Sequence, residues 1–270
     1  MRTILLTSNR FQLLSLIYIL PLLVLGGCID PESKIHTPLN KNVIIIGEFH
    51  GTEQIRHILV DTAQAQADHG EIAIGLEAPA CALSTVFASS RLISLPGDSG
   101  EPCDMSGINE GRISTAMKAG VDKLLEDNKN AKIFSIENHE GRLITDFQLH
   151  ANAWEVRAAN RIIQIRDEGY RVISIAGNLH VRKTNYKFNG PETVPFGALL
   201  SDQALIIGIV PRNSGQVYAC FQSCDIQEVP ASSVAGKDGL DCNIGDPHYD
   251  CVYTVDYYTP SRPLTQDNAR

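Results

Sequence analysis

Short runs of apolar residues recur along the chain, and most are followed by a stretch with apolar residues at helical spacing. The five runs span residues 42–46, 72–76, 132–136, 171–176 and 204–210. Their apolar residues occupy consecutive rather than alternate positions, which is typical of strands covered on both faces, as in a parallel sheet. The pattern therefore predicts a central, largely parallel sheet with helices packed on both of its faces.

Three stretches between these runs predict helices. The first repeats Ile55, Ile58 and Leu59 and stops before Gly70. The second and third repeat apolar residues in the same way, namely Met117, Val121, Leu124 and Leu125, and then Trp154, Ala158, Ile162 and Ile165. Strand and helix in alternation indicate an α/β domain with right-handed crossovers.

The first 27 residues have the pattern of an export signal. Arg2 and Arg10 precede an apolar stretch over residues 11–24, which is shorter than a membrane-spanning helix needs and is interrupted by polar residues. The sequence Leu25-Gly26-Gly27-Cys28 then resembles the lipobox of bacterial lipoproteins, in which the cysteine is diacylated and becomes the mature N-terminus. This implies a protein held by lipid on Cys28 at the periplasmic side of a bacterial membrane, with the outer membrane favoured. An ordinary signal peptide or membrane anchor with a chance cysteine is the alternative.

The rest of the chain is long enough for one large domain. We expect a linker over residues 28–41 and a single α/β domain over residues 42–270. Residues 79–111 carry a Pro- and Gly-rich stretch and predict an insertion. From about residue 215 the alternating runs 216–221 and 251–258 predict an antiparallel C-terminal extension braced by disulfides.

Cysteine usage and charge agree with an exported protein that does not bind nucleic acid. Six cysteines follow Cys28, at positions 81, 103, 220, 224, 242 and 251, an even number that suits disulfides in an oxidising compartment. Their grouping favours Cys81 with Cys103 and the last four among themselves. Those four are spaced C-x3-C and C-x8-C rather than as the C-x2-C pairs of common zinc sites. The net charge is −8, and no long basic run is present, so we expect no nucleic-acid partner.

Ionisable side chains follow four of the predicted strands, at the point where each strand ends. Glu48 and His50 follow the first strand, Glu77 the second, and Glu137 the third, and Asn178 and His180 follow the fourth. The carboxyl ends of parallel strands meet at one edge of a sheet, and ligands bind there. Glu48 and His50 are two residues apart in an extended segment, so their side chains leave on the same side. We therefore expect these residues to share one cleft.

Two chemistries fit this set. A histidine takes a proton from water near neutral pH, and a neighbouring carboxylate fixes its tautomer. Equally, His50, His180, Glu48 and Glu77 are suitable ligands for a divalent zinc, manganese or iron ion. Each residue alone is as well explained as a solvated or hydrogen-bonded side chain, but the four together favour a functional site.

The motifs resemble those of a known superfamily. Gly47-Glu48-Phe49-His50-Gly51-Thr52, Glu77 and Gly177-Asn178-Leu179-His180, in this order after apolar strands, are similar to the superfamily that joins erythromycin esterases, ChaN-like haem-binding lipoproteins and Tiki/TraB-type proteins. The resemblance covers residues 42–210. The helix that carries Trp154-Glu155-Val156-Arg157 is similar to an Arg-bearing helix of that superfamily. The lipoprotein signal favours the ChaN-like branch.

This resemblance implies a hydrolase, esterase- or metallopeptidase-like, that activates water on an ester or amide of a small molecule or peptide. His50 would be the base or a metal ligand with Glu48 as its partner, and His180 the second histidine. Glu77 would be a further carboxylate and Arg157 would neutralise a carboxylate or an oxyanion; Asn178 and Glu137 are candidate cofactor-binding residues. The alternative is a haem- or iron-binding lipoprotein without turnover, for which Tyr186 or a C-terminal tyrosine is a further candidate ligand.

Overall fold

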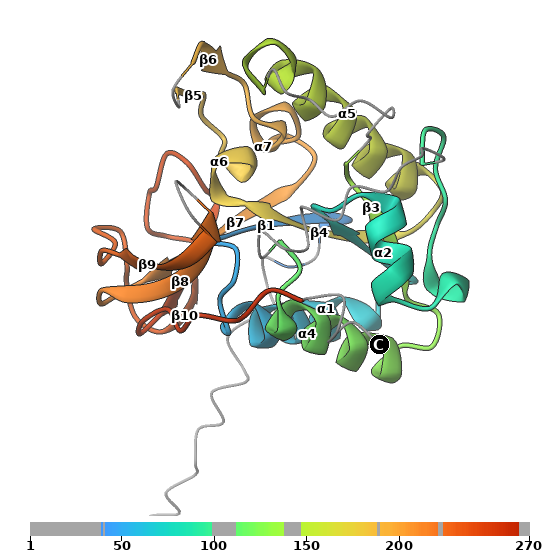
Figure 1. Cartoon of the computed structure of the whole chain (residues 1–270), viewed down its shortest axis with the longest axis horizontal. Helices are drawn as coiled ribbons and strands as arrows, with labels where there is room; N and C mark the ends of the chain where they lie inside the picture. The colour runs from blue at the N-terminus through green and yellow to red at the C-terminus, as the bar shows by residue number, and fades with distance from the viewer. Residues whose placement is uncertain are drawn as a thin grey trace, which may run out of the picture. The chain divides into compact units, whose positions relative to one another are not determined.

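A seven-stranded sheet forms the centre of the protein, in the order β10-β11-β7-β1-β4-β2-β3 (Figure 1). The computed structural model describes residues 39, 41–98, 112–137, 147–187, 190–220 and 224–264, with the side chains of 147–152, 220 and 224 excepted. All of these residues belong to one compact unit, Ser33–Arg270.

The five predicted apolar runs are parallel strands of this sheet. They form β1 (Val43–Glu48), β2 (Ile72–Leu76), β3 (Lys132–Ser135), β4 (Arg171–Gly177) and β7 (Leu205–Pro211). Strand β1 pairs in parallel with both β4 and β7, and β2 pairs in parallel with both β4 and β3. Every residue of β1, β2 and β7 is buried, as expected of strands covered on both sides. The predicted α/β fold class is confirmed.

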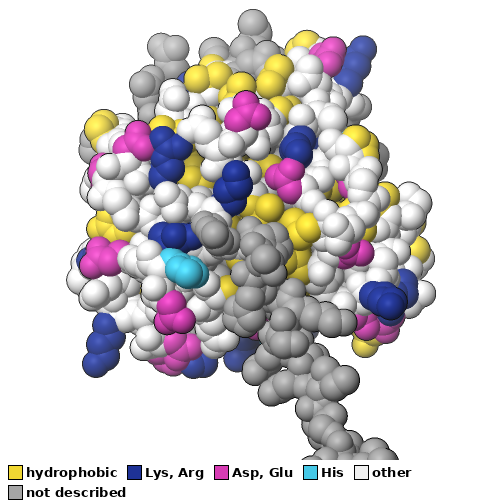
Figure 2. Space-filling model, turned by 180° about the vertical axis from the view of Figure 1, so that it is seen from behind, with side chains coloured by type: hydrophobic (Ala, Val, Ile, Leu, Met, Phe, Trp, Pro, Cys, Tyr) yellow, Lys and Arg dark blue, Asp and Glu magenta, His cyan; other side chains and the backbone are white. Residues whose placement is uncertain are grey.

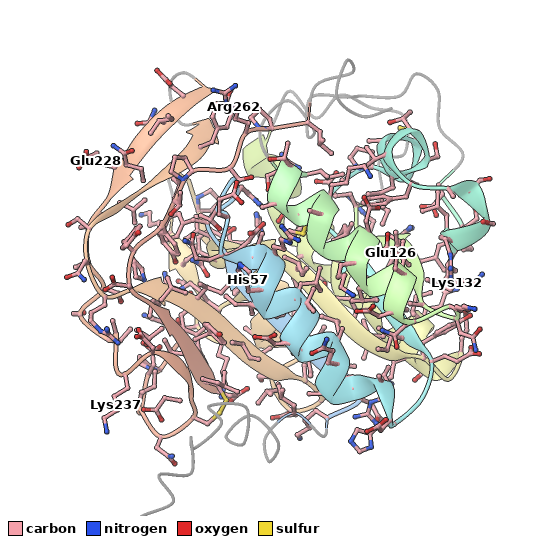
Figure 3. The ribbon with its side chains drawn as sticks, turned by 90° about the horizontal axis from the view of Figure 1, so that it is seen from below. His57, Glu126, Lys132, Glu228, Lys237 and Arg262 are labelled. Carbon is pink, nitrogen blue, oxygen red and sulfur yellow. A yellow bond between two sulfur atoms is a disulfide. The ribbon has the colours of Figure 1, made fainter. Side chains whose placement is uncertain are left out.

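Helices pack on both faces of the sheet, as the pattern predicts. On one face lie α1 (Ile55–Ala67) and α4 (Thr115–Asp127), which run side by side in Figure 3. On the other lie α5 (Phe147–Asp167) and α7 (Phe196–Leu199). Alternate residues of β1 point to opposite faces of the sheet. Ile44 and Ile46 pack in the core with α1 and α4, whereas Val43 and Ile45 pack with α5.

Several shorter elements lie before the C-terminal part of the chain. They are α2 (Ala80–Val86), the 3-10 helix η2 (Ser89–Arg91), α6 (Asn178–Val181), β5 (Tyr186–Lys187) and β6 (Glu192–Thr193). Strands β5 and β6 pair as a small antiparallel sheet. Basic and acidic side chains are interspersed over the face that Figure 2 shows, and exposed hydrophobic side chains lie between them.

The C-terminal part differs from the predicted extension in its strand pairing. Strand β8 (Gly215–Cys220), from the first predicted run, forms an antiparallel hairpin with β9 (Cys224–Val229), a strand that the sequence did not indicate. The second run instead becomes β11 (Cys251–Val255), which pairs in parallel with β7 and carries β10 (Gly239–Asp241) at the sheet edge. Cys251 and Val252 are wholly buried, so this strand gains more from the cover of the central sheet than a two-stranded hairpin would give it.

The disulfides are partly described. Cys242 and Cys251 are joined, as the grouping of the last four cysteines favours, and neither thiolate is therefore available to a zinc ion. Cys81 is disulfide-bonded, but Cys103 lies outside the described residues, so their pairing stays a prediction. The hairpin register places Cys220 opposite Cys224.

Several predictions concern residues that the structure does not describe. Residues 1–38 include the predicted signal, Cys28 and most of the linker, and residues 99–111 include the second half of the predicted insertion. Within the described ranges, no helix is long and apolar enough to cross a membrane.

Candidate functional site

Three strand ends meet at Gly177. Glu48 is the last residue of β1 and lies opposite Gly177, the last residue of β4. Glu77 directly follows β2, on the other side of β4, and its Oε2 accepts a hydrogen bond of 2.7 Å from the backbone N–H of Gly177. Helix α6 follows β4 directly and carries His180. The sheet topology thus brings together residues that are up to 132 positions apart.

His50 is held between two buried glutamates. Its Nδ1 lies 3.2 Å from Oε1 of Glu48, and its Nε2 lies 3.6 Å from Oε2 of Glu77. The following residue, Gly51, has a φ of +71°, and its carbonyl accepts N–H groups from Ser261 at 2.7 Å and Tyr218 at 3.2 Å. The C-terminal segment therefore fixes the backbone beside His50 in a conformation that glycine adopts readily.

His180 has a glutamate of its own. Its Nδ1 lies 2.6 Å from Oε1 of Glu155, a wholly buried residue of α5. Oε1 of Glu155 also accepts the hydroxyl of Tyr186 at 3.3 Å, and its Oε2 accepts the backbone N–H of Phe196 at 2.7 Å. The ring of Trp154 lies 4.5 Å from the imidazole ring of His180, centroid to centroid. The position of His180 is thus set by α5, β5 and α7 together.

Glu155 was not among the site residues that the sequence indicated, although a signal for it exists. It shares one face of α5 with Ala158, Ala159 and Ile162, at the spacing i, i+3, i+4 and i+7. The other three pack in the core. A carboxylate on an apolar helix face needs a buried partner, which here is His180.

The two imidazoles and Glu77 converge on one point. A methyl group added at Gly177 would lie 3.0 Å from Nε2 of His50, 3.7 Å from Oε2 of Glu77 and 3.7 Å from Cδ2 of His180. His50, Glu77 and His180, which come from three strand ends, therefore lie close together around Gly177. Gly177 keeps this point free of side-chain atoms.

Arg112 supplies the guanidinium of this group. Its Nη1 forms an ion pair with Glu137 and lies 3.9 Å from Oε1 of Glu77. Arg157 was expected in this role, but among the described residues no ion pair joins it to these glutamates, and its Nε is buried without a hydrogen-bond partner. Arg112 has no sequence signal, because it follows the predicted insertion rather than a strand.

The last two predicted residues, Glu137 and Asn178, lie beside the group. Glu137 is buried and bonded to Arg112. Asn178 begins α6, and its Oδ1 accepts the hydroxyl of Tyr249 at 3.5 Å. Glu137 thus contacts the group directly, whereas Asn178 contacts the C-terminal part of the chain.

The pKa shifts within the group favour a proton held between each histidine and the glutamate that it bonds. Burial raises the pKa of Glu48 and of Glu155, against the opposing effect of the histidine that each one bonds. Burial would also raise the pKa of Glu77, but the charges of His50, His180 and Arg112 bring it below its usual value. Burial alone would lower the pKa of both histidines, yet Glu77 together with Glu48 or Glu155 raises each above its usual value.

Exposure is graded within the group. The side chains of His50, His180 and Arg112 are 23%, 20% and 25% exposed, whereas those of the four glutamates are 6% exposed or less. An incoming molecule therefore meets the imidazoles and the guanidinium, and the carboxylates lie beneath them.

The predicted metal ligands do not fit a metal ion in this arrangement. In the described ranges, no three or more His, Cys, Asp or Glu side chains are placed to hold one. His50, His180, Glu48 and Glu77 were the expected set. Each imidazole bonds a glutamate through Nδ1, which leaves its Nε2 available, but Arg112 brings a positive charge next to Glu77. A second cation at this position would be repelled by the guanidinium.

A solved structure shares this fold, and two more were found at lower TM-scores. A mutant of the erythromycin esterase EreC in its open conformation is 12% identical, with a TM-score of 0.51 over 83% of this chain and 93% of its own. The type III effector HopBA1 is 15% identical, with a TM-score of 0.43 over 80% and 88% of the two chains. The haem-binding protein ChaN of Campylobacter jejuni is 10% identical, with a TM-score of 0.37 over 72% and 89%.

The expected resemblance is thus confirmed at the level of the fold. Identities of this size carry no information about substrate or cofactor. The sequence itself matches no protein-family profile and no curated protein.

Proposed function

We propose that this protein is a hydrolase that activates a water molecule with His50 and His180 and cleaves an ester or amide bond. The observation that carries the proposal is the convergence of two partly exposed imidazoles, each anchored at Nδ1 by its own buried glutamate, on the open point beside Gly177. An imidazole that is anchored at Nδ1 keeps its Nε2 for proton exchange.

The residues divide the reaction between them. Nε2 of His50 accepts a proton from water as the water oxygen bonds to the carbonyl carbon, and Glu48 stabilises the resulting imidazolium. The guanidinium of Arg112 stabilises the negative charge that develops on the carbonyl oxygen. Protonated His180 then donates its Nε2 proton to the departing alkoxide or amine as the carbon–oxygen or carbon–nitrogen bond breaks. Proton exchange with solvent restores both histidines.

Substitution of the two histidines tests this proposal. We expect His50→Gln and His180→Gln each to lower kcat/KM by about 100-fold or more on whichever member of a chromogenic ester and amide panel the wild-type protein cleaves. His57→Gln is the matched control, because His57 is exposed on α1 (Figure 3). Undiminished hydrolysis by the His50→Gln, His180→Gln double variant would show that the assignment is wrong.

We also propose that the protein is exported and held by lipid on Cys28 at the periplasmic side of a bacterial membrane. The Leu25-Gly26-Gly27-Cys28 motif supports this, and the disulfide of Cys242 with Cys251 suits an oxidising compartment. Mass spectrometry of the protein from membranes should find an N-terminal diacylated Cys28 and no residue before it. An unmodified cysteine preceded by residues 1–27 would refute lipid anchoring.

A second candidate function is haem binding, which one observation favours. The partly exposed imidazole of His180 lies beside the rings of Trp154 and Tyr186. Haem binding uses an imidazole nitrogen as axial ligand to the iron that the haem supplies. Haem titration should then produce a Soret band that His180→Ala removes and His57→Ala keeps. A spectrum of free haem throughout would exclude this candidate.

A further inference from the structure

The disulfide of Cys242 with Cys251 closes a loop that contacts the chain on both sides of His180. This loop, residues 242–251, carries Asp246, His248, Tyr249 and Asp250. Its partners are α6 and the three residues that follow it. None of the residues in these contacts takes part in the proposed reaction.

On the C-terminal side of His180, the loop is bonded to three consecutive residues. Asp250 pairs through Oδ1 with the ammonium of Lys183, and the backbone N–H of Lys183 donates to the carbonyl of His248 at 2.8 Å. The ring of His248 bonds Arg182 through Nε2 and the hydroxyl of Thr184 through Nδ1. Each residue of the 182–184 segment thus has a partner in the loop.

Asp250 also ties the loop to the sheet. Its Oδ2 accepts the backbone N–H of Ile206, in β7, at 2.9 Å. One carboxylate therefore joins Lys183 to a central strand, which is a rigid support.

On the N-terminal side of His180, Tyr249 is the contact. Its ring packs against the backbone of Gly208, since a methyl group added there would lie 2.7 Å from ring carbons. Its hydroxyl lies 3.5 Å from Oδ1 of Asn178, the first residue of α6. Oδ1 of Asn178 in turn lies 2.6 Å from the position of a methyl group added at Gly47, on β1. Both ends of α6 are therefore in contact with the loop.

A helix as short as α6 depends on such support. It has four residues, and Gly177 at its N-cap provides no side-chain hydrogen bond. Helices of this length are not stable by themselves, so their position comes from tertiary contacts. His180 is the third of the four residues.

We propose that the disulfide-closed loop 242–251 is a positioning device that holds α6, and with it the imidazole of His180, against Glu155 and the open point beside Gly177. Asp250 and Tyr249 are its positioning residues, and the Cys242–Cys251 bond keeps them in register with α6. This inference rests on the proposed hydrolase function only for its kinetic consequence. The placement of His180 is a separate property that can be observed without turnover.

Two variants of the full-length protein test the device. The double change Cys242→Ser, Cys251→Ala opens the loop, and Asp250→Ala removes both carboxylate bonds while the disulfide remains. We expect each to lower kcat by about tenfold with little change in KM, because a displaced acid slows the chemical step more than binding. We also expect the downfield NMR resonance of the Nδ1 proton of His180, which reports its bond to Glu155, to move upfield or broaden. Asn243→Ala, an exposed loop position, is the control and should change neither.

The readouts separate this inference from the proposed function. If Asp250→Ala lowers only the thermal midpoint and leaves both kcat and the His180 resonance unchanged, the loop is structural and the inference is wrong. If the wild-type protein hydrolyses nothing, the proposed function fails, and the His180 resonance alone still decides the positioning. If the cysteine variant does not fold, Asp250→Ala gives the answer with the disulfide intact.

Discussion

Gly177 lies where Glu77, His50 and His180 meet, and its lack of a side chain keeps their meeting point open. The strand-end rule indicates Glu48, His50, Glu77 and His180 from the sequence, because parallel strands bring their carboxyl ends to one edge. It does not indicate Arg112, which follows no predicted strand, or Glu155, which lies on a helix. Their roles depend on the rotation of α5 and the path of a loop, and local sequence patterns do not determine either one.

A methyl group at Gly177 tests the open point directly. The backbone there has φ −58° and ψ 141°, which alanine adopts without strain. We therefore expect Gly177→Ala to leave the thermal midpoint nearly unchanged and to lower kcat/KM by about 100-fold, because the methyl lies 3.0 Å from Nε2 of His50. Gly236→Ala is the control, since its methyl meets only Asp241, at 3.7 Å. Full activity of Gly177→Ala would show that substrate does not use this point.

At the scale of the element, the strands were predictable because burial on both faces leaves a continuous apolar run. All five runs became parallel strands of the central sheet. Strand β11 was expected in an antiparallel extension, because its alternating residues fit either arrangement. Its pairing with β7 depends on which sheet edge is free after the chain has folded, and the local pattern carries no information on that.

An ion pair on α5 provides a prediction at this scale. The side chains of Arg161 and Asp98 form a buried ion pair, and Nε of Arg161 also donates to the carbonyl of Ser135 at 2.7 Å. Asp98→Ala leaves the guanidinium buried without its carboxylate, so we expect a loss of about 3 to 5 kcal/mol in the free energy of unfolding. Asp167→Ala breaks an exposed pair with Arg166 on the same helix and should cost about 0 to 1 kcal/mol. Urea unfolding measures both, and equal losses would contradict the account.

At the scale of the whole molecule, two kinds of contact position the residues of the site. The central sheet brings the strand ends together, and contacts from the C-terminal part of the chain support both histidines. Ser261 and Tyr218 hold the carbonyl next to His50, and the loop 242–251 holds α6. The apolar runs of the sequence predict the sheet that brings the strand ends together. They do not predict the C-terminal contacts, because these join segments more than 60 residues apart through single hydrogen bonds and ion pairs.

The raised pKa of both histidines makes stability depend on pH in a defined direction. A group whose pKa is raised on folding stabilises the protein below its unfolded pKa, here 6.5, and this contribution is lost as the pH rises through the folded pKa. We therefore expect the stability difference between wild type and the His50→Gln, His180→Gln double variant to shrink as the pH rises above 6.5. Urea unfolding between pH 5.5 and 9 checks this, and a difference that grows with pH would contradict it.

The central claim is that His50 and His180 face the same carboxylate, Glu77, in one cluster. The most direct test is an NMR titration of both imidazoles in the wild-type protein and in Glu77→Gln. We predict that both pKa values lie above 6.5 in the wild type, and that both fall when the charge of Glu77 is removed. The account is contradicted if Glu77→Gln shifts one histidine and leaves the other unchanged, or if both titrate at 6.5 in either protein.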